Sequence, residues 1–256
     1  MQTADELRDA VEAYVGSLTL SPELGGLEEA LRYSLESGGK RVRPVLCIAV
    51  AEANGASIED ALPAAAALEL VHTFSLVHDD LPAMDDDDER RGRPSAHVAF
   101  GEGVALLSGD ALLSEAYKLA LTYEGSEVAR DLVDATIGMI AGQYRDITGD
   151  TSELEELHRL KTGRLFVAAV RIGLDVARVP DVDRASWIAF GEDVGLLFQV
   201  VDDLLDGDGY VERLGPEGAR RLADEVSERA AGQLDALGAD TSVLRDVLDA
   251  LTFRTG

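Results

Sequence analysis

Residues 57–80 read SIEDALPAAAALELVHTFSLVHDD, and this stretch decides the fold class of the chain. Ser57 is followed three residues later by Asp60, the pattern of a helix N-cap with an acidic residue in the first turn. Apolar residues then recur at helical spacing until the segment ends in Asp79 and Asp80. The pattern predicts one long apolar helix that carries two carboxylates at its C-terminal end.

Helical signals continue on both sides of this stretch. Ser21-Pro22 has the form of a helix start with proline at the first helical position, and Asn54-Gly55 is a stop signal. Alternating strand patterns are nearly absent, and no linker or internal repeat divides the chain. Further helical segments are expected at 103–122, 127–147, 152–173, 183–206, 216–236 and 242–252. We therefore expect an all-α fold, a single domain over residues 1–256 built as a bundle of about eight to ten helices.

A second acidic segment ends another apolar helix, at residues 195–206, which read GLLFQVVDDLLD. In a chain with 27 aspartates, three at this spacing should arise by chance at roughly 0.3 places. The setting adds weight, because carboxylates beside an apolar helix are costly unless they are paired or bind a cation. Asp202 and Asp206 lie one turn apart with Asp203 beside them, so the segment offers oxygen ligands to magnesium.

The first acidic segment runs directly into a basic one, since residues 79–94 read DDLPAMDDDDERRGRP. Pro82 interrupts the helix, so that Asp85 can fold back beside Asp79. Carboxylates crowded in this way repel one another unless a cation lies among them. Three arginines follow at once: Arg90, Arg91 and Arg93. Carboxylates for a metal beside arginines for phosphate oxygens predict an enzyme that grips a diphosphate through magnesium ions.

The charge balance is strongly acidic, with 49 acidic and 23 basic residues and a formal net charge of −26. Such a chain repels nucleic acid and anionic membranes, so neither is expected as a partner. The basic residues include only three lysines: Lys40, Lys118 and Lys161. An acidic, lysine-poor surface is typical of halophilic proteins, in which concentrated ions screen the self-repulsion.

Several local features bear on the compartment. Cys47 lies in an apolar run and is interpreted as a buried hydrophobic residue. The N-terminal sequence MQTADELRDA lacks the features of a signal peptide. No apolar run is expected to reach the length of a membrane span, because the longest, Leu62–Val71, contains Glu69. We therefore expect a soluble, cytoplasmic protein with no integral membrane segment.

Taken together, the motifs resemble those of the trans-isoprenyl diphosphate synthases, the farnesyl and geranylgeranyl diphosphate synthase family. They follow the family's order: GGKRVRP (Gly38–Pro44), DDLPAMDDDDERRGRP (Asp79–Pro94), SGDALL (Ser108–Leu113), GQYRD (Gly142–Asp146), KTG (Lys161–Gly163) and FQVVDDLLD (Phe198–Asp206). The resemblance covers about Gly38 to Leu222. It implies a helical bundle of the isoprenoid synthase type around a central cavity, usually a homodimer. It also implies the Mg²⁺-dependent condensation of isopentenyl diphosphate with an allylic diphosphate.

The resemblance implies roles for individual residues as well. Magnesium would be bound by Asp79, Asp80, Asp85, Asp202, Asp203 and Asp206. The allylic diphosphate would be contacted by Arg90 and Lys161, and the isopentenyl diphosphate by Lys40, Arg43, His72 and Arg91. Thr162 and Gln199 would lie near the developing allylic cation, and with Lys161 they form the expected catalytic group.

Product length is expected to depend on the floor of the cavity. A prenyl tail that grows along the helix carrying Asp79 meets side chains about one turn earlier, at Phe74 and Ser75. An aromatic residue there, with the two extra residues in DDLPAMD, resembles bacterial-type farnesyl synthases and indicates a short product. A salt-adapted lineage that makes isoprenoid membrane lipids would instead need a C20 product. We expect C15 or C20, and nothing longer than C25.

The chain departs from the family's pattern after Asp206. Members usually continue with a lysine-bearing loop, whereas here Gly207–Tyr210 leads directly to the next helical segment. Either the enzyme dispenses with the loop, or a mobile segment is missing from the sequence. Two other functions stay open. The missing lysines favour a regulatory subunit of a heteromeric prenyl synthase, although such subunits typically lose the aspartates. A class I terpene cyclase is disfavoured by the second aspartate motif and by GGKRVRP.

Overall fold

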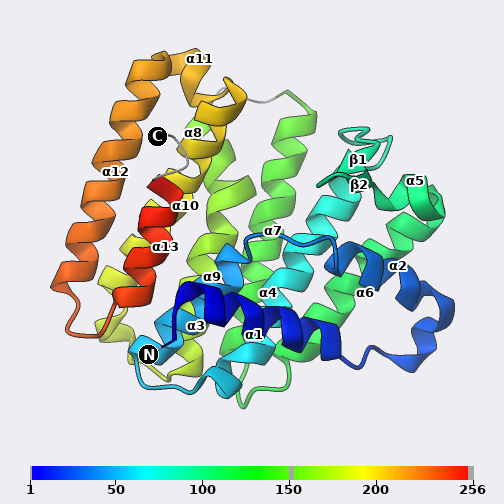
Figure 1. The fold of residues 1–256 in the computed structure, drawn as a ribbon, viewed down its shortest axis with the longest axis horizontal. Helices are drawn as coiled ribbons and strands as arrows, with labels where there is room; N and C mark the ends of the chain where they lie inside the picture. The colour runs from blue at the N-terminus through cyan, green and yellow to red at the C-terminus, as the bar shows by residue number, and fades with distance from the viewer. Residues whose placement is uncertain (1, 150–152, 253–256) are drawn as a thin grey trace.

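The computed structural model describes residues 2–149 and 153–252, and helices form nearly all of the regular structure there (Figure 1). The α-helices are α1 (Ala4–Ser17), α2 (Glu28–Leu35), α3 (Val42–Ala53), α4 (Ile58–Asp79), α5 (Ala96–Phe100), α6 (Glu102–Ala120), α7 (Glu127–Ile147), α8 (Leu154–His158), α9 (Arg164–Val176), α10 (Ala185–Asp206), α11 (Tyr210–Leu214), α12 (Pro216–Ala236) and α13 (Ser242–Thr252). Shorter turns are η1 (Pro22–Leu27), η2 (Arg159–Gly163) and η3 (Asp181–Asp183), and the strands are β1 (Glu89–Arg90) and β2 (Arg93–Pro94). The all-α prediction is confirmed.

The helix boundaries follow the predicted patterns closely. The Ser57 hydroxyl accepts a hydrogen bond from the backbone nitrogen of Asp60 at 3.1 Å, so the expected N-cap of α4 is present. Helices α7, α12 and α13 have the predicted bounds. The segment expected at 152–173 is divided into α8, the π-helical turn η2 and α9, and its first residue lies outside the described residues. The structure thus divides the chain more finely than the expected eight to ten helices.

Helix α4 forms the centre of the bundle, where it packs against α1, α3, α6 and α9. Its first half is rich in buried alanines, which let neighbouring helices approach closely. As predicted, the helix is continuous through Glu69, so it extends beyond the apolar run Leu62–Val71. Its length and composition would allow it to cross a membrane, but 67% of its apolar 18-residue stretch is buried inside the protein. A buried core helix can have the same length and composition, so these two features are weak evidence for a membrane span.

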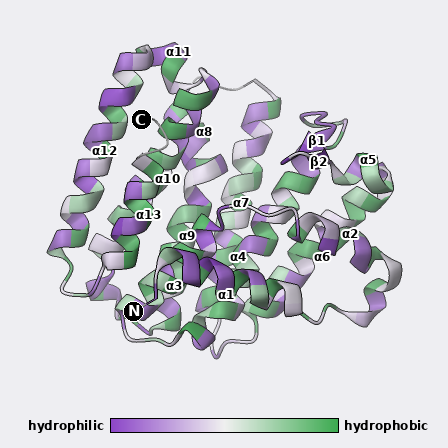
Figure 2. Ribbon diagram, in the orientation of Figure 1, coloured by the Kyte–Doolittle hydropathy of each residue, from purple (hydrophilic) through white to green (hydrophobic). Residues whose placement is uncertain are grey.

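Both aspartate segments lie at one end of the bundle. In Figure 1 the β1–β2 hairpin and α11 both lie at the upper end. Helix α4 leads toward the hairpin and α10 leads into α11, so their C-terminal carboxylates are brought to this end. Figure 2 shows hydrophilic residues concentrated in the hairpin and hydrophobic ones within the helical body. The fold therefore places charged chemistry above an apolar interior.

The small β1–β2 hairpin was not predicted. Its two-residue turn has positive φ angles at Arg91 (55°) and Gly92 (75°), the conformation that a tight hairpin turn favours. The guanidinium of Arg93 lies 4.1 Å from the ring centre of Tyr33, and the Tyr33 hydroxyl donates to the Pro94 carbonyl at 2.7 Å. Strands of two residues are too short to show an alternating pattern, so no periodic signal in the sequence predicts them.

Candidate active site

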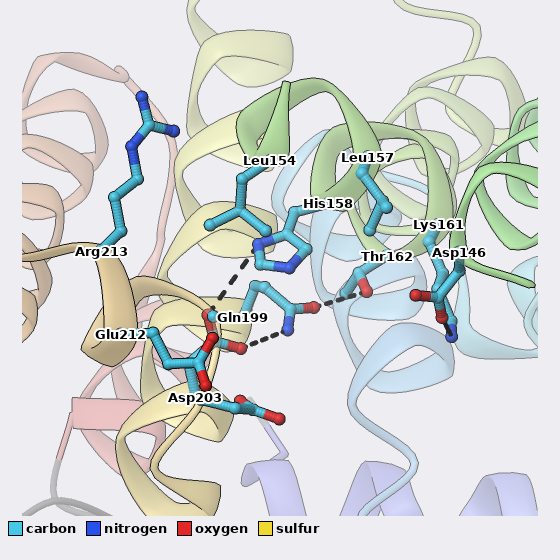
Figure 3. A pocket seen from close by; sticks show the side chains of 12 residues that line it. Asp146, Leu154, Leu157, His158, Lys161, Thr162, Gln199, Asp203, Glu212 and Arg213 are labelled. Atoms are coloured by element: carbon cyan, nitrogen blue, oxygen red, sulfur yellow. Dashed lines mark hydrogen bonds and ion pairs between the residues drawn. The ribbon is translucent and has the colours of Figure 1, made fainter. Parts of the chain in front are cut away.

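Two cavities meet beneath the aspartate segments. The first, of about 790 Å³, lies among α7, α8, η2, α10 and α11; we call it the polar cavity (Figure 3). The second, of about 590 Å³, lies among α4, α6, α7 and α9; we call it the apolar cavity. Lys161 and Thr162 line both. The apolar cavity is otherwise lined mainly by side chains such as Phe74, Leu113, Met139, Ile140, Ile147 and Leu165. In place of one central cavity there is thus a charged cavity beside a mainly apolar one, and their walls share Lys161 and Thr162.

The first aspartate segment folds back as predicted. The backbone nitrogen of Asp85 donates to the Asp79 carbonyl at 2.9 Å, which brings the two residues together. Buried Asp80 is held by Arg90, whose Nε donates to it at 2.9 Å. Burial is the main cause that raises the pKa of Asp79 to about 6; the charge of Lys161 opposes this rise and that of Asp85 adds to it. The Asp79 carboxylate is therefore incompletely balanced by the protein.

The carboxylates of this segment fit magnesium by their chemistry. In the described part of the chain, no three His, Cys, Asp or Glu side chains are already gathered around one point. Carboxylate oxygens are hard ligands of the kind that Mg²⁺ prefers. A cation beside Asp79 and Asp85 would offset the burial that raises the pKa of both. The residues present therefore fit the ion, while their assignment as ligands stays a prediction.

The three aspartates of the second segment have different environments. Asp203 is buried, and its Oδ1 accepts a hydrogen bond from Gln199 Nε2 at 2.7 Å. Its Oδ2 accepts one from the backbone nitrogen of Tyr210 at 2.8 Å. Asp202 is half-buried and Asp206 is exposed. Asp203 thus ties α10 to α11, and its predicted role as a metal ligand is not tested by this geometry.

The three predicted catalytic residues are brought together. Lys161 and Thr162 belong to the π-helical turn η2, a distortion that is frequent at functional sites. The Thr162 hydroxyl donates to Gln199 Oε1 at 2.7 Å, and Lys161 pairs with Asp146 at the end of α7 (Figure 3). Gln199 therefore links Thr162 to Asp203 in one chain of hydrogen bonds. The GQYRD motif alone assigns no role to Asp146. Its ion pair with Lys161 is the contact that identifies Asp146 as part of the site.

The residues expected to hold isopentenyl diphosphate surround an incompletely paired guanidinium. Arg43 Nη1 lies 3.5 Å from His72 Nε2, and the Arg43 guanidinium lies 4.4 Å from the ring centre of Phe166. Burial is the main cause that lowers the pKa of Arg43 to about 10. Its buried Nε has no hydrogen-bond partner among the described residues. A bound anion would complete this environment.

The glycines of the GGKRVRP motif contact the guanidinium of Arg91. Arg91 Nη1 donates to the Gly38 carbonyl. Gly39 has a φ of 142°, and a Cβ there would clash with the Arg91 guanidinium. The positive φ favours glycine here, and any other side chain would also displace the Arg91 guanidinium. The same loop carries Lys40 between Gly39 and Arg41, and the role of Lys40 in binding isopentenyl diphosphate stays a prediction.

Sequence reasoning missed the buried ion pair beneath this loop. Arg41 has a left-handed backbone (φ 48°), and its buried guanidinium pairs with Glu69 of α4. Its Nε also donates to Glu12 of α1 at 2.8 Å, and its Nη2 donates to the Leu35 carbonyl at 2.6 Å. These bonds fasten the loop to three helices, α4, α1 and α2. The signal was Glu69 itself, because a carboxylate inside an apolar helix requires a partner.

Phe74 and Ser75 line the apolar cavity, as expected for residues near a growing prenyl tail. The Phe74 ring meets the His78 ring edge-on, with ring centres 5.0 Å apart. His78 Nε2 in turn lies 3.0 Å from the Leu106 carbonyl of α6. Whether Phe74 is the floor stays a prediction. Sequence reasoning missed the α6 and α7 side chains of this wall, which a local pattern on α4 does not reveal.

Comparison with known proteins agrees with this geometry. A family model described as polyprenyl synthetase matches residues 25–220. The chain is 41% identical over 204 residues to the farnesyl diphosphate synthase of Bacillus subtilis, covering 74% of this chain and 69% of that protein. It is 41% identical over 203 residues to the geranylgeranyl diphosphate synthase of Cyanophora paradoxa, covering 73% and 67%. The crystal structure of a geranyltransferase from Legionella pneumophila is similar, with a TM-score of 0.89, 31% identity and coverage of 98% and 96%. The chain belongs to the polyprenyl synthetase family.

Proposed function

We propose that this protein is a short-chain prenyl diphosphate synthase, a transferase that joins isopentenyl diphosphate to a C5–C15 allylic diphosphate. The products would be farnesyl (C15) diphosphate, geranylgeranyl (C20) diphosphate, or both. One observation carries the proposal: the charged polar cavity and the apolar cavity share Lys161 and Thr162 in their walls. A diphosphate head with a hydrocarbon tail matches this division. The similarity to farnesyl and geranylgeranyl diphosphate synthases supports the same conclusion.

Ionisation of the allylic substrate requires that the charge of the leaving diphosphate be neutralised. Arg90 and Lys161 would bind its oxygens; both lie close enough to the Asp79 carboxylate for their charges to lower its pKa. Magnesium, when held by the aspartates of the two segments, would supply further positive charge to the leaving group. The C–O bond then breaks, and its electron pair leaves with the diphosphate.

Substrate binding can proceed without exposing unpaired charge. In the free protein Arg90 pairs with Asp80 and Lys161 pairs with Asp146. A diphosphate that arrives with magnesium can exchange partners with both pairs, because the phosphate takes the cationic side chains and the ion takes the carboxylates. The exchange conserves the number of ion pairs, which keeps its desolvation cost low.

The allylic cation must then be kept from water until the second substrate attacks. The apolar cavity provides this shelter. The hydrogen-bonded pair of Thr162 and Gln199 presents oxygen dipoles that favour the cation without attacking it. Arg43 and His72, with Lys40 and Arg91, would hold isopentenyl diphosphate so that its double bond faces the cation. Proton loss to the departing diphosphate would complete the reaction, so no separate protein base is required.

Exposed apolar side chains support a homodimer as the assembly. Those on α5, α6 and α7 include Val98, Val104, Leu106, Leu107, Ile137, Ile140, Tyr144 and Ile147. Contiguous exposed apolar surface often marks an interface between proteins. Ile140 and Tyr144 also line the apolar cavity, so a second copy on this face would shield the reaction from solvent.

One assay tests the proposed function. The purified protein is incubated in high salt with Mg²⁺, isopentenyl diphosphate and a C5, C10 or C15 allylic diphosphate, and the products are identified by mass. Linear C15 or C20 diphosphates are expected. A cyclic hydrocarbon would indicate a terpene cyclase. Turnover only after addition of a second, different chain would indicate a subunit of a heteromeric synthase.

A further inference from the structure

Gln143 of α7 is a buried amide in the wall of the apolar cavity. The residue is 9% exposed and belongs to the GQYRD motif. Neither its Oε1 nor its Nε2 has a hydrogen-bond partner among the residues that the structure describes. Buried side-chain amides in proteins are almost always hydrogen-bonded, to protein or to water. The partner of this amide must therefore be something that enters the cavity.

The depth of Gln143 in the cavity matches the reacting end of a prenyl substrate. Helix α7 packs closely against η2 at this level. A Cβ added to Gly142 would clash with the Lys161 backbone nitrogen, which shows how close the two elements are. Three residues later Asp146 pairs with Lys161, and four residues earlier Met139 lines the apolar cavity. A helix rises about 1.5 Å per residue, which places Gln143 roughly 4.5 Å deeper than Asp146. The first carbons of a substrate whose diphosphate lies at Lys161 reach this depth.

We propose that Gln143 is a catalytic residue that contacts the allylic substrate at its ionising carbons, an inference that rests on the proposed function. When the C1–O bond breaks, its electron pair leaves with the diphosphate and positive charge spreads over C1 and C3. The Gln143 carbonyl oxygen faces these carbons and stabilises the charge by its dipole. The amide nitrogen donates to a diphosphate oxygen.

The missing protein partners are what suit Gln143 to this role. A side chain that is already hydrogen-bonded would have to give up a bond to turn toward the substrate, whereas the Gln143 amide gives up none within the protein. The proposal also accounts for the GQYRD motif as a unit. Gly142 permits the close approach of α7 to η2, Gln143 enters the cavity, and Asp146 holds Lys161.

The test separates catalysis from stability. Gln143→Leu replaces an unpaired buried amide by an apolar group of similar size, so its melting temperature is expected to equal or exceed that of the wild type. Its kcat is expected to fall about tenfold or more, with the KM for isopentenyl diphosphate unchanged. Gln143→Glu places a carboxylate near the diphosphate and is expected to raise the KM for the allylic substrate. Gln143→Met is a second apolar variant in case the leucine packs badly.

Gln233 of α12 offers a matched control. Its Oε1 is also buried without a partner among the described residues, but it lines neither cavity. Gln233→Leu should therefore leave kcat and both KM values unchanged. Wild-type kcat in both Gln143→Leu and Gln143→Met would overturn the inference, as would a lower melting temperature with full activity in either. A wild-type protein without prenyl transfer would instead refute the proposed function.

Discussion

At the scale of single residues, the site contains a histidine that the folded protein keeps neutral. Burial, followed by the charges of Arg43 and Arg91, lowers the pKa of His72 well below its usual value. The unfolded chain binds a proton at this residue near pH 6.5, whereas the folded chain does not. The folded state therefore loses stability as the pH falls below about 6.5.

His72→Gln is expected to remove this loss. The melting temperature of the variant, relative to the wild type, should rise as the pH is lowered from about 7.5 to about 5.5. Thermal unfolding at a series of pH values measures the difference. The subtraction cancels carboxylates that titrate in both proteins. A difference that stays constant over this range would show that His72 is not held neutral by the fold.

Phe74 is the residue at which product length is tested. Its ring projects into the apolar cavity and is held edge-on by His78. Phe74→Ala should deepen the cavity and lengthen the main product by one or more C5 units, which mass analysis of the products detects. Ser75→Ala is the control, because the Ser75 hydroxyl donates to the His72 carbonyl and its loss changes little volume. An unchanged product length in Phe74→Ala would show that Phe74 does not form the floor of the apolar cavity.

At the scale of the elements, the end of α10 distinguishes two kinds of aspartate. Asp203 accepts hydrogen bonds from the Tyr210 backbone N–H, which can only donate, and from Gln199 Nε2, while Gln199 Oε1 accepts from Thr162. An amide at position 203 has one donor group, so either it faces another donor or Gln199 must turn its amide and give up its bond from Thr162. Asp203→Asn should therefore cost about 1–3 kcal/mol of unfolding free energy and also lower kcat, since Gln199 loses its anchor.

Asp206 provides the comparison, because it is exposed. Asp206→Asn should leave the unfolding free energy unchanged and raise the Mg²⁺ concentration needed for half-maximal activity. Chemical denaturation and magnesium titration of both variants separate the two effects. Should Asp203→Asn raise only the Mg²⁺ requirement, Asp203 would be a metal ligand, as the sequence motif predicts, rather than the anchor between α10 and α11.

The helices also show how much of the structure the sequence predicts. Apolar residues at helical spacing are a local signal, so α4, α7 and α12 were located within a residue or two. The motifs likewise identified the aspartates and the residues that meet at Lys161. The pairing of Arg41 with Glu69, and the amide of Gln143, depend on how helices pack side by side. Such contacts join residues far apart in the chain, and no local periodicity encodes them.

For the whole molecule, the net charge of −26 predicts salt-dependent stability. Like charges on the folded surface repel at distances that fall from about 10 Å to about 3 Å between 0.1 and 1 M salt. The melting temperature should therefore rise by several degrees over this range of KCl. Sucrose of equal osmolality controls for effects other than screening. A melting temperature that is flat or falls with KCl would contradict the halophilic interpretation.

The exposed apolar face on α6 and α7 sets the last expectation, a homodimer whose formation shields the apolar cavity. Ile137 is 60% exposed on this face and does not line the cavity, so Ile137→Glu adds charge to the interface alone. The wild type should have twice the chain mass by light scattering, and the variant the mass of one chain. Val182 is 88% exposed on η3, away from this face, and Val182→Glu should stay dimeric. Because Ile140 and Tyr144 are exposed in a single chain yet line the cavity, the monomeric variant should also lose most prenyl transfer. A wild type that is monomeric and fully active would refute both the interface and its role in excluding water.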